Sequence, residues 1–224
     1  PDDYVRRFSA DVVRLYLMFI GPWEQGGDWS DSGINGVARW VSRLWEVCQR
    51  DVSALPAQGA ADGALTRKTH QTIRRVLADV ERFKMNTAIS ALMELSNELS
   101  RVHDEGAASR EAWSEGVERL LLLLAPLAPH LAEELWERTG RAYSVHQQPL
   151  PEWDAALAAE EEATLVVQVN GRLRDRISVP AGVSDADAKQ AALDSERVRS
   201  YVEGREVARV LYVPERYLVN IVVR

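Results

Sequence analysis

Apolar residues recur at a spacing of three or four through the first two thirds of the chain, which is the period of an α-helix. The clearest stripe runs from Ile34 to Cys48, and the charged residues of that stretch fall on the other side. Further stripes run through residues 65–83, 85–102 and 113–124. Phe83 is the last apolar member of the first of these three. Four long amphipathic helices joined by short loops predict a helical bundle.

The expected helix ends have the residue types that usually mark them. Ser9 and Ser109 are good N-caps, because a serine oxygen accepts a hydrogen bond from a free amide of the first turn. Pro126 should interrupt the last long helix, since proline lacks an amide donor and collides with the preceding turn. Pro129 suits the first turn of a short final helix that ends at 139–140.

The period changes from 3.6 to 2 at Thr164, which is typical of β-strands. We expect strands over 165–169, 172–179, 207–213 and 217–223, and helices over 184–193 and 195–202. This ββααββ order predicts a small α+β domain that follows the mainly α-helical bundle. The predicted domains are connector helices over 1–30, the bundle over 31–140, a proline-containing linker over 141–163 and the α+β domain over 164–224.

The pair Asn170–Gly171 between the first two strands predicts a β-hairpin. A two-residue turn would place the apolar row of one strand on the same sheet face as the arginine row of the other, which is unfavourable. One extra loop residue would put Arg172, Arg174 and Arg176 together on the opposite face. We therefore predict a three-residue loop with Gly171 in the left-handed conformation, which glycine adopts without steric cost.

Composition limits the class of protein. The chain has 224 residues, of which 46% are hydrophobic, so a packed core is expected. Its one cysteine, Cys48, excludes an internal disulfide framework, and the chain has no apolar run of membrane-spanning length. We expect a soluble cytoplasmic protein with no membrane partner. Because the chain begins at Pro1, we also expect a fragment.

The net charge of −7 argues against non-specific binding to nucleic acid. The charge is uneven, however. Residues 164–224 carry 10 Lys and Arg against 8 Asp and Glu, so the acidic excess lies in the rest of the chain. The composition therefore leaves room for a nucleic-acid binder with local basic surfaces.

Three stretches resemble the bacterial-type leucyl-tRNA synthetase family. Residues 1–45 include Trp-Ser-Asp-Ser-Gly-Ile at 29–34, and are similar to the segment that follows the catalytic core in that family. Residues 123–136 resemble a bundle element shared by the leucine, isoleucine, valine and methionine enzymes. Residues 167–180 and 207–223 resemble the small C-terminal domain of the leucine enzyme in particular. Ser9 departs from the glycine that is common in the family, which is a conservative change.

The resemblance implies a tRNA-binding bundle of the class Ia anticodon-binding type and a C-terminal domain that contacts the tRNA elbow. It implies leucine tRNA as partner, together with the catalytic and editing domains of the same full-length chain. ATP-dependent leucylation would belong to those domains, because neither His-Ile-Gly-His nor Lys-Met-Ser-Lys-Ser occurs here. We expect this chain alone to be no enzyme, to hold no cofactor (ATP and Mg²⁺ belong to the parent), to bind no DNA and to be a monomer.

Basic side chains are the candidate tRNA contacts, since phosphate contacts position a nucleic acid and make its affinity depend on salt. The candidates in the C-terminal domain are Arg172, Arg174, Arg176, Arg205, Arg209 and Arg216. Those on the bundle are Arg39, Arg43, Arg67, Lys68 and Arg75. The alternative for each group is a surface that charge keeps soluble. Trp40 could stack on a base, but packing in the core is favoured because it borders the apolar stripe.

Other functions are possible from the same pattern. The nearest alternatives are the same region of a valine, isoleucine or methionine enzyme, and a stand-alone helical protein-interaction module. A hydrolase centred on His130 lacks a recognisable nucleophile, and capping of the helix that begins at Pro129 explains that histidine better. The remaining histidines have no metal-ligand spacing, so we predict neither a catalytic nor a metal site.

Overall fold

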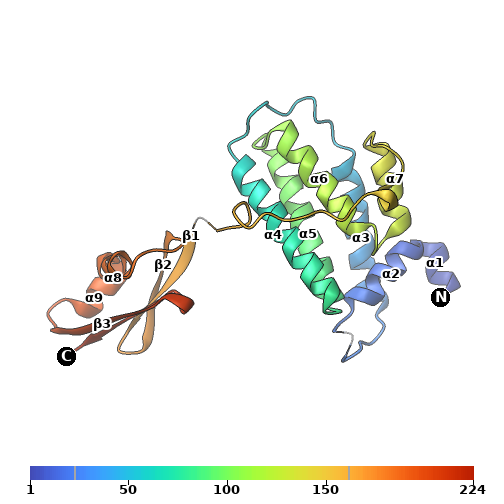
Figure 1. The fold of residues 1–224 in the computed structure, drawn as a ribbon. Helices are drawn as coiled ribbons and strands as arrows, with labels where there is room; N and C mark the ends of the chain where they lie inside the picture. Colours follow the sequence, from blue (N-terminus) through green and yellow to red (C-terminus); the bar gives the residue numbers. More distant parts are fainter. Residues whose placement is uncertain (23, 161) are drawn as a thin grey trace. The chain divides into compact units, whose positions relative to one another are not determined.

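The computed structural model describes residues 1–22, 24–160 and 162–224, and the chain forms two compact units, Pro1–Ala159 and Glu160–Arg224. The first unit is helical (Figure 1). Its helices are α1 Asp2–Phe8, α2 Ala10–Phe19, α3 Asp31–Cys48, α4 Asp62–Glu81, α5 Met85–Asp104, α6 Arg110–Leu124 and α7 Pro129–Arg138, with a short 3-10 turn η1 at Val145–Gln147. Among the described residues, none of the helices combines the length and the hydrophobicity that a membrane span requires.

The predicted helix ends are confirmed. The Ser9 hydroxyl accepts from the amide of Val12 at 3.4 Å, and Ser109 caps α6 through the amide of Ala112 at 3.2 Å. The long helix α6 ends at Leu124, and α7 begins at Pro129. The serine caps and the prolines therefore mark these boundaries in the sequence.

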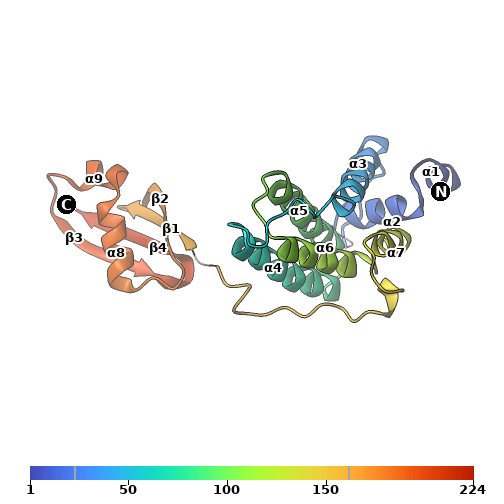
Figure 2. The same ribbon diagram turned by 90° about the horizontal axis from the view of Figure 1, so that it is seen from above.

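The core of the helical unit lies between α3, α4, α5 and α6, which pack side by side (Figure 2). Its largest fully buried side chains include Leu44, Leu92, Leu95 and Leu120. Trp40 is 1% exposed, and its indole nitrogen donates to Ser96 Oγ at 3.0 Å. The predicted core role of Trp40 is confirmed, since a residue buried at this depth has no face free for a base.

One apolar prediction is wrong. The stripe that was expected to end at Phe83 leaves the core earlier, because α4 ends at Glu81 and Phe83 lies in the turn before α5. The Phe83 side chain is 67% exposed.

The segment after α7 lies along the helical unit. The amide of Asp154 donates to His70 Nδ1 at 3.0 Å, and Gln71 donates to the carbonyl of Ala158 at 3.1 Å. Ala158 itself is 2% exposed. Within the range 141–163 that was predicted as a linker, the structure thus places the residues up to Ala159 with the helices.

The second unit has the predicted ββααββ order, so the fold class is confirmed. Its elements are β1 Glu162–Val169, β2 Arg172–Pro180, α8 Asp185–Asp194, α9 Glu196–Val202, β3 Val207–Val213, a 3-10 turn η2 at Pro214–Arg216 and β4 Leu218–Val223. The sheet order is β2-β1-β4-β3, in which β1 and β4 are parallel and both hairpins antiparallel. Helices α8 and α9 cover one face over Leu165, Val167, Val219 and Ile221.

Candidate nucleic-acid interface

The turn between β1 and β2 contains two residues, because Val169 pairs directly with Arg172. Asn170 and Gly171 both have positive φ, 50° and 74°, as the tight type I′ turn requires. The predicted three-residue loop is therefore wrong. The left-handed conformation predicted for Gly171 is confirmed.

A β-bulge in β2 supplies the extra residue that the apolar pattern demands. Gln168 pairs with Leu173 and Val167 pairs with Asp175, so Arg174 has no partner of its own. A bulge and a longer loop each add one residue to the same strand. The sequence pattern therefore required the insertion but could not place it.

The bulge separates the three arginines that were predicted to share one sheet face. Arg176 lies on the face away from the helices, whereas Arg172 pairs into the row that the helices cover. The guanidinium of Arg174 lies over the ring of Tyr201 in α9, 4.0 Å from its centroid. Its Nε is buried and has no hydrogen-bond partner among the residues that the structure describes. The prediction of a single arginine face is wrong, and Arg174 contacts its own helix.

The sheet face that α8 and α9 leave uncovered, which we call the open face, has an arginine on each edge strand. Arg176 is on β2, and Arg209 is on β3, where it pairs with Val222 of β4. The neighbours of Val222 in β4 are buried under the helices, so Val222 and Arg209 face the other way. Gln168 and Asn220 pair between them on the two central strands. Both arginines are exposed and have no ion pair within the described residues. The open face is thus a candidate surface for phosphates.

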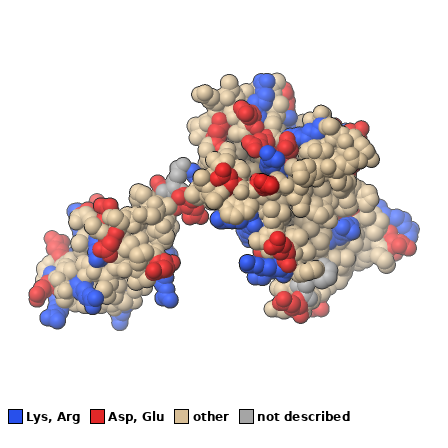
Figure 3. Space-filling model, in the orientation of Figure 1, with Lys and Arg blue, Asp and Glu red and all other residues tan. Residues whose placement is uncertain are grey.

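The remaining C-terminal candidates do not share this face as a group. Arg172, Arg205 and Arg216 are all exposed, and none has an acidic partner in the described part of the chain. Arg216 lies in the 3-10 turn before β4, and Arg205 follows α9. Basic side chains project from several points of this unit's surface in Figure 3.

On the helical unit, Arg39 and Arg43 lie one turn apart on α3 and are exposed. Neither has an ion-pair partner among the residues that the structure describes. The predicted polar face of α3 is therefore accessible. Two guanidinium groups one helical turn apart suit contacts to a polyanionic backbone.

The basic group on α4 differs, because its side chains contact the protein itself. Lys68 forms an ion pair with Glu94 of α5 at 2.7 Å, and Arg75 contacts the same carboxylate at 3.3 Å. Arg67 donates to the carbonyl of Ala159 at 2.9 Å. These contacts give each side chain a structural role, and the hydrogen bonds and positive charges of Lys68 and Arg75 lower the pKa of Glu94.

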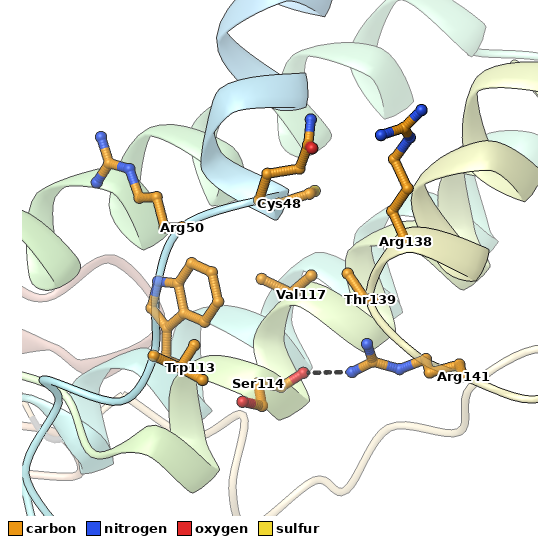
Figure 4. A pocket seen from close by; sticks show the side chains of 10 residues that line it. Cys48, Arg50, Trp113, Ser114, Val117, Arg138, Thr139 and Arg141 are labelled. Atoms are coloured by element: carbon orange, nitrogen blue, oxygen red, sulfur yellow. Dashed lines mark hydrogen bonds between the residues drawn. The ribbon is translucent and has the colours of Figure 1, made fainter.

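A basic hollow of about 240 Å³, which the sequence pattern did not predict, lies between the ends of α3 and α7 and the start of α6 (Figure 4). Arg50, Arg138 and Arg141 line it, and Arg141 donates to the carbonyl of Ser114 at 2.9 Å. Each arginine also forms an ion pair. Arg50 lies 2.9 Å from Asp104, Arg138 lies 2.7 Å from Glu134, and Arg141 lies 3.5 Å from Glu118. No acidic residue is among the described lining residues themselves. Only the packing of three helices brings these arginines together.

Cys48 lines the same hollow but is not poised to react. Burial raises the pKa of its thiol to about 12, although the positive charge of Arg141 acts in the opposite direction. The reactive thiolate is therefore scarce at neutral pH.

His130 has the structural role that the sequence favoured, though its partner is distant in the chain. Its Nδ1 lies 3.0 Å from Asp11 Oδ1, and the amide of Leu131 donates to Asp11 Oδ2 at 2.6 Å. Asp11 is 4% exposed, and so its buried carboxylate caps α7 from α2. Within the described residues no group of His, Cys, Asp and Glu could hold a metal ion.

Comparisons with known proteins agree with this arrangement. Residues 62–190 match the family model described as the anticodon-binding domain of tRNA ligase. The whole chain is 47% identical to a leucine–tRNA ligase of Dehalococcoides mccartyi and 52% identical to that of Rubrobacter xylanophilus. It spans 27% of the length of each of these relatives.

Two solved structures are similar in fold. One is a ternary complex of the Agrobacterium radiobacter K84 agnB2 LeuRS with tRNA and LeuAMS. The match covers the whole of this chain and 30% of the length of that chain, with a TM-score of 0.83 at 30% identity. The other is the free methionyl-tRNA synthetase of Mycobacterium tuberculosis. The match covers 63% of this chain and 34% of the length of that chain, with a TM-score of 0.52 at 19% identity. The second likeness shows the fold alone.

Proposed function

The chain belongs to the family of anticodon-binding domains of tRNA ligases, and we propose that it is the tRNA-binding C-terminal part of a leucine–tRNA ligase. The observation that carries this proposal is the match of the entire chain to leucine–tRNA ligases at 47% and 52% identity. A valine, isoleucine or methionine enzyme is not favoured, and neither is a stand-alone interaction module. The match to leucine enzymes includes the C-terminal α+β unit as well as the bundle.

In this proposal ATP-dependent leucylation and editing are activities of the longer ligase, of which the chain spans about a quarter. The chain contains neither of the two ATP-binding motifs of that enzyme class. Its own residues hold the tRNA so that the acceptor end can reach the reacting groups elsewhere. Such positioning lowers the entropic cost of the reaction.

The exposed cations support backbone recognition of the tRNA. Arg176 and Arg209 on the open face, and Arg39 and Arg43 on α3, can approach phosphates without first leaving a protein partner. The open face presents valine, leucine, glutamine and asparagine side chains, and no aromatic ring pairs into it. We therefore propose that this face contacts phosphates and sugars at the tRNA elbow, and that it reads shape.

A titration of the chain with leucine tRNA and with an unrelated tRNA, at low and moderate salt, tests the proposal. We expect tighter binding of leucine tRNA, with an affinity that falls steeply as salt rises. The double variant Arg176→Glu with Arg209→Glu should weaken binding by about tenfold or more, since each phosphate contact contributes a slope of about 0.7–0.9 in log affinity against log salt.

The matched control for each single reversal, Arg176→Glu or Arg209→Glu, is Arg199→Glu, at an exposed arginine of α9 on the covered side of the sheet. It changes the net charge of the same unit and should leave the affinity within about twofold, because only contacting charges release counterions. If the control weakens tRNA binding equally, the effect of the open-face variants comes from net charge and not from contacts at that face. Absence of tRNA binding at low salt would contradict the proposed function itself.

A further inference from the structure

The turn between α4 and α5 is closed by a helix-capping motif that normally requires glycine. The amide of Lys84 donates to the carbonyl of Asp79 at 2.8 Å, and the amide of Phe83 donates to that of Val80 at 3.1 Å. These two bonds define a Schellman motif, in which the residue after the cap adopts the left-handed conformation. Here that residue is Phe83, with φ of 55°.

The same unit closes two other helices with the same motif and uses glycine each time. Gly106 after α5 has φ of 59°, and Gly140 after α7 has φ of 76°. In both cases the corresponding pair of amide bonds is present, reaching back to His103 and Val102, and to Glu137 and Trp136. A side chain with a Cβ adopts this conformation at a steric cost. Backbone geometry therefore does not explain why the residue that closes α4 is a phenylalanine.

Packing does not explain it either. Phe83 is 67% exposed, and it is not among the apolar residues that pack against the core of the unit. A large aromatic ring is thus held in solvent, in a conformation that disfavours it, at the tip of the hairpin formed by two 20-residue helices. Strained residues of this kind concentrate where a protein binds a partner.

The surroundings of the ring indicate the chemistry of that partner. Phe83 lines a hollow of about 250 Å³ together with Pro22, Glu24, Arg82, Lys84, Asn86 and Thr87. This volume exceeds the roughly 150 Å³ that accommodates a benzene ring inside a protein. Arg82 and Lys84 flank Phe83 in the sequence and line the same hollow, both are exposed, and neither has an ion-pair partner within the described residues.

We propose that Phe83 stacks on an unpaired base of an RNA, while Arg82 and Lys84 contact the phosphates on either side of that nucleotide. This inference rests on the proposed tRNA-binding function and names a base-stacking site within it. An aromatic face beside uncommitted cations is the combination that binds single-stranded nucleotides. Glu24 and Asn86 can accept hydrogen bonds from amino groups on the base edge, and they belong to the same lining.

RNA suits this site better than a further protein domain. Charged side chains are depleted at the centres of protein interfaces, and burial of Arg82 and Lys84 against a protein without acidic partners would be costly. A polyanion supplies the opposite charge on both sides of the ring.

The test compares the 224-residue chain with Phe83→Gly, Phe83→Asn and Phe83→Trp. The titrant is a leucine tRNA transcript, followed by fluorescence anisotropy at several salt concentrations. Glycine and asparagine tolerate the left-handed backbone but lack the ring. We expect both to weaken binding roughly fivefold to hundredfold, the range that stacking of one base provides, without changing the salt slope. Phe83→Trp should retain the affinity of the parent chain.

Replacement of the flanking cations, unlike that of Phe83, should change the salt dependence of tRNA binding. The double variant Arg82→Gln with Lys84→Gln should reduce the salt slope by about one to two, because two phosphate contacts are lost. An unchanged slope would remove the phosphate part of the proposal.

Thermal unfolding distinguishes loss of stacking from loss of fold. Phe83→Gly should raise Tm, since glycine relieves the backbone strain, and so weaker binding could not result from unfolding. A lowered Tm would show that the ring packs and would overturn the inference. So would unchanged tRNA affinity in Phe83→Gly while the parent chain binds. If the parent chain itself fails to bind at low salt, the proposed function fails, and the stacking site with it.

Discussion

The two units of this molecule use their basic residues differently. In the helical unit, most cations contact the protein: Lys68 and Arg75 hold α5 through Glu94, and Arg50 donates to the carbonyl of Ser100 at 2.8 Å. In the C-terminal unit, exposed arginines such as Arg176 and Arg209 have no such partner within the described residues.

The reason lies in how each architecture is closed. The helical unit has several elements that meet at their ends and sides, so a long side chain on one helix can reach a carbonyl or carboxylate of the next. Within the described part of the C-terminal unit, the four-stranded sheet presents a face that α8 and α9 leave uncovered, and its edge strands β2 and β3 each pair with a strand on one side only. A basic residue in the first unit is therefore more often a structural contact, and in the second it is more often accessible to a ligand.

The largest effect is expected in the helical core. Trp40→Ala removes a ring that is 1% exposed and hydrogen-bonded to Ser96, so the free energy of unfolding of the helical unit should fall by about 3–5 kcal/mol. Urea unfolding followed by circular dichroism measures this loss. Trp153→Ala is the matched control, because that ring is 41% exposed and should cost far less. Similar losses in both variants would contradict the assignment of Trp40 to the core.

Acidification should weaken a contact between the start of α4 and the start of α6. Burial raises the pKa of Asp62, but hydrogen bonds from the amides of Ser109 and Gly59, at 2.6 and 2.9 Å, lower it further, so the net pKa lies below the ordinary value. Its stabilisation is therefore complete above the unfolded pKa of about 3.9 and is lost as pH falls through the folded pKa. Asp62→Asn should lose about 1 kcal/mol at pH 7 and much less at pH 3. Tm measured across this range decides, and an equal loss at both values would exclude the carboxylate as the cause.

The C-terminal unit offers the parallel case. The Ser195 hydroxyl, which donates to Asp175 at 2.6 Å, and the amide of Arg176 hold the pKa of Asp175 below its usual value. In the variant Asp175→Asn, the stability of this unit should therefore fall less as the pH is lowered. Acid titrations of Asp62→Asn and Asp175→Asn followed by NMR report the unfolding of each unit separately. A flat acid response of the unmodified C-terminal unit would contradict the contact.

The smallest effect is expected at the paired cations. Glu94→Gln removes the acidic partner of Lys68 and Arg75, and because Glu94 is half exposed the stability change should stay below about 1 kcal/mol. The informative measurement is tRNA affinity, since the variant releases two cations. An affinity that rises about tenfold would mean that these residues can serve as phosphate contacts, as their sequence pattern suggested. An unchanged affinity would leave them as structural contacts between α4 and α5.

Local pattern accounts for most of the secondary structure. The helical stripes, the serine caps and the change of period at Thr164 all depend on residues within one or two turns of each other, and the structure agrees with them apart from the end of one stripe. Phe83 was the exception, because it satisfied the helical spacing while the helix had already ended at Glu81. A period describes which face a residue would occupy, but it does not state where the helix stops.

The hairpin shows the same limit at the level of faces. Alternation required one additional residue in β2, and the chain met that requirement at Arg174 instead of in the turn. The bulge turns Arg174 toward Tyr201, a contact between residues 27 positions apart that strand alternation does not encode.

Elements, caps and approximate boundaries followed from the order of residues, because backbone hydrogen bonding and side-chain periodicity are local. The partners of charged residues followed only from packing. Arg50, Arg138 and Arg141 meet around one hollow, and Asp11 caps a helix that begins 118 positions later, because several helices come together in space. The choice between a cation that binds its own protein and one left for a ligand depends on distances across the fold, and these arise only when the elements are assembled.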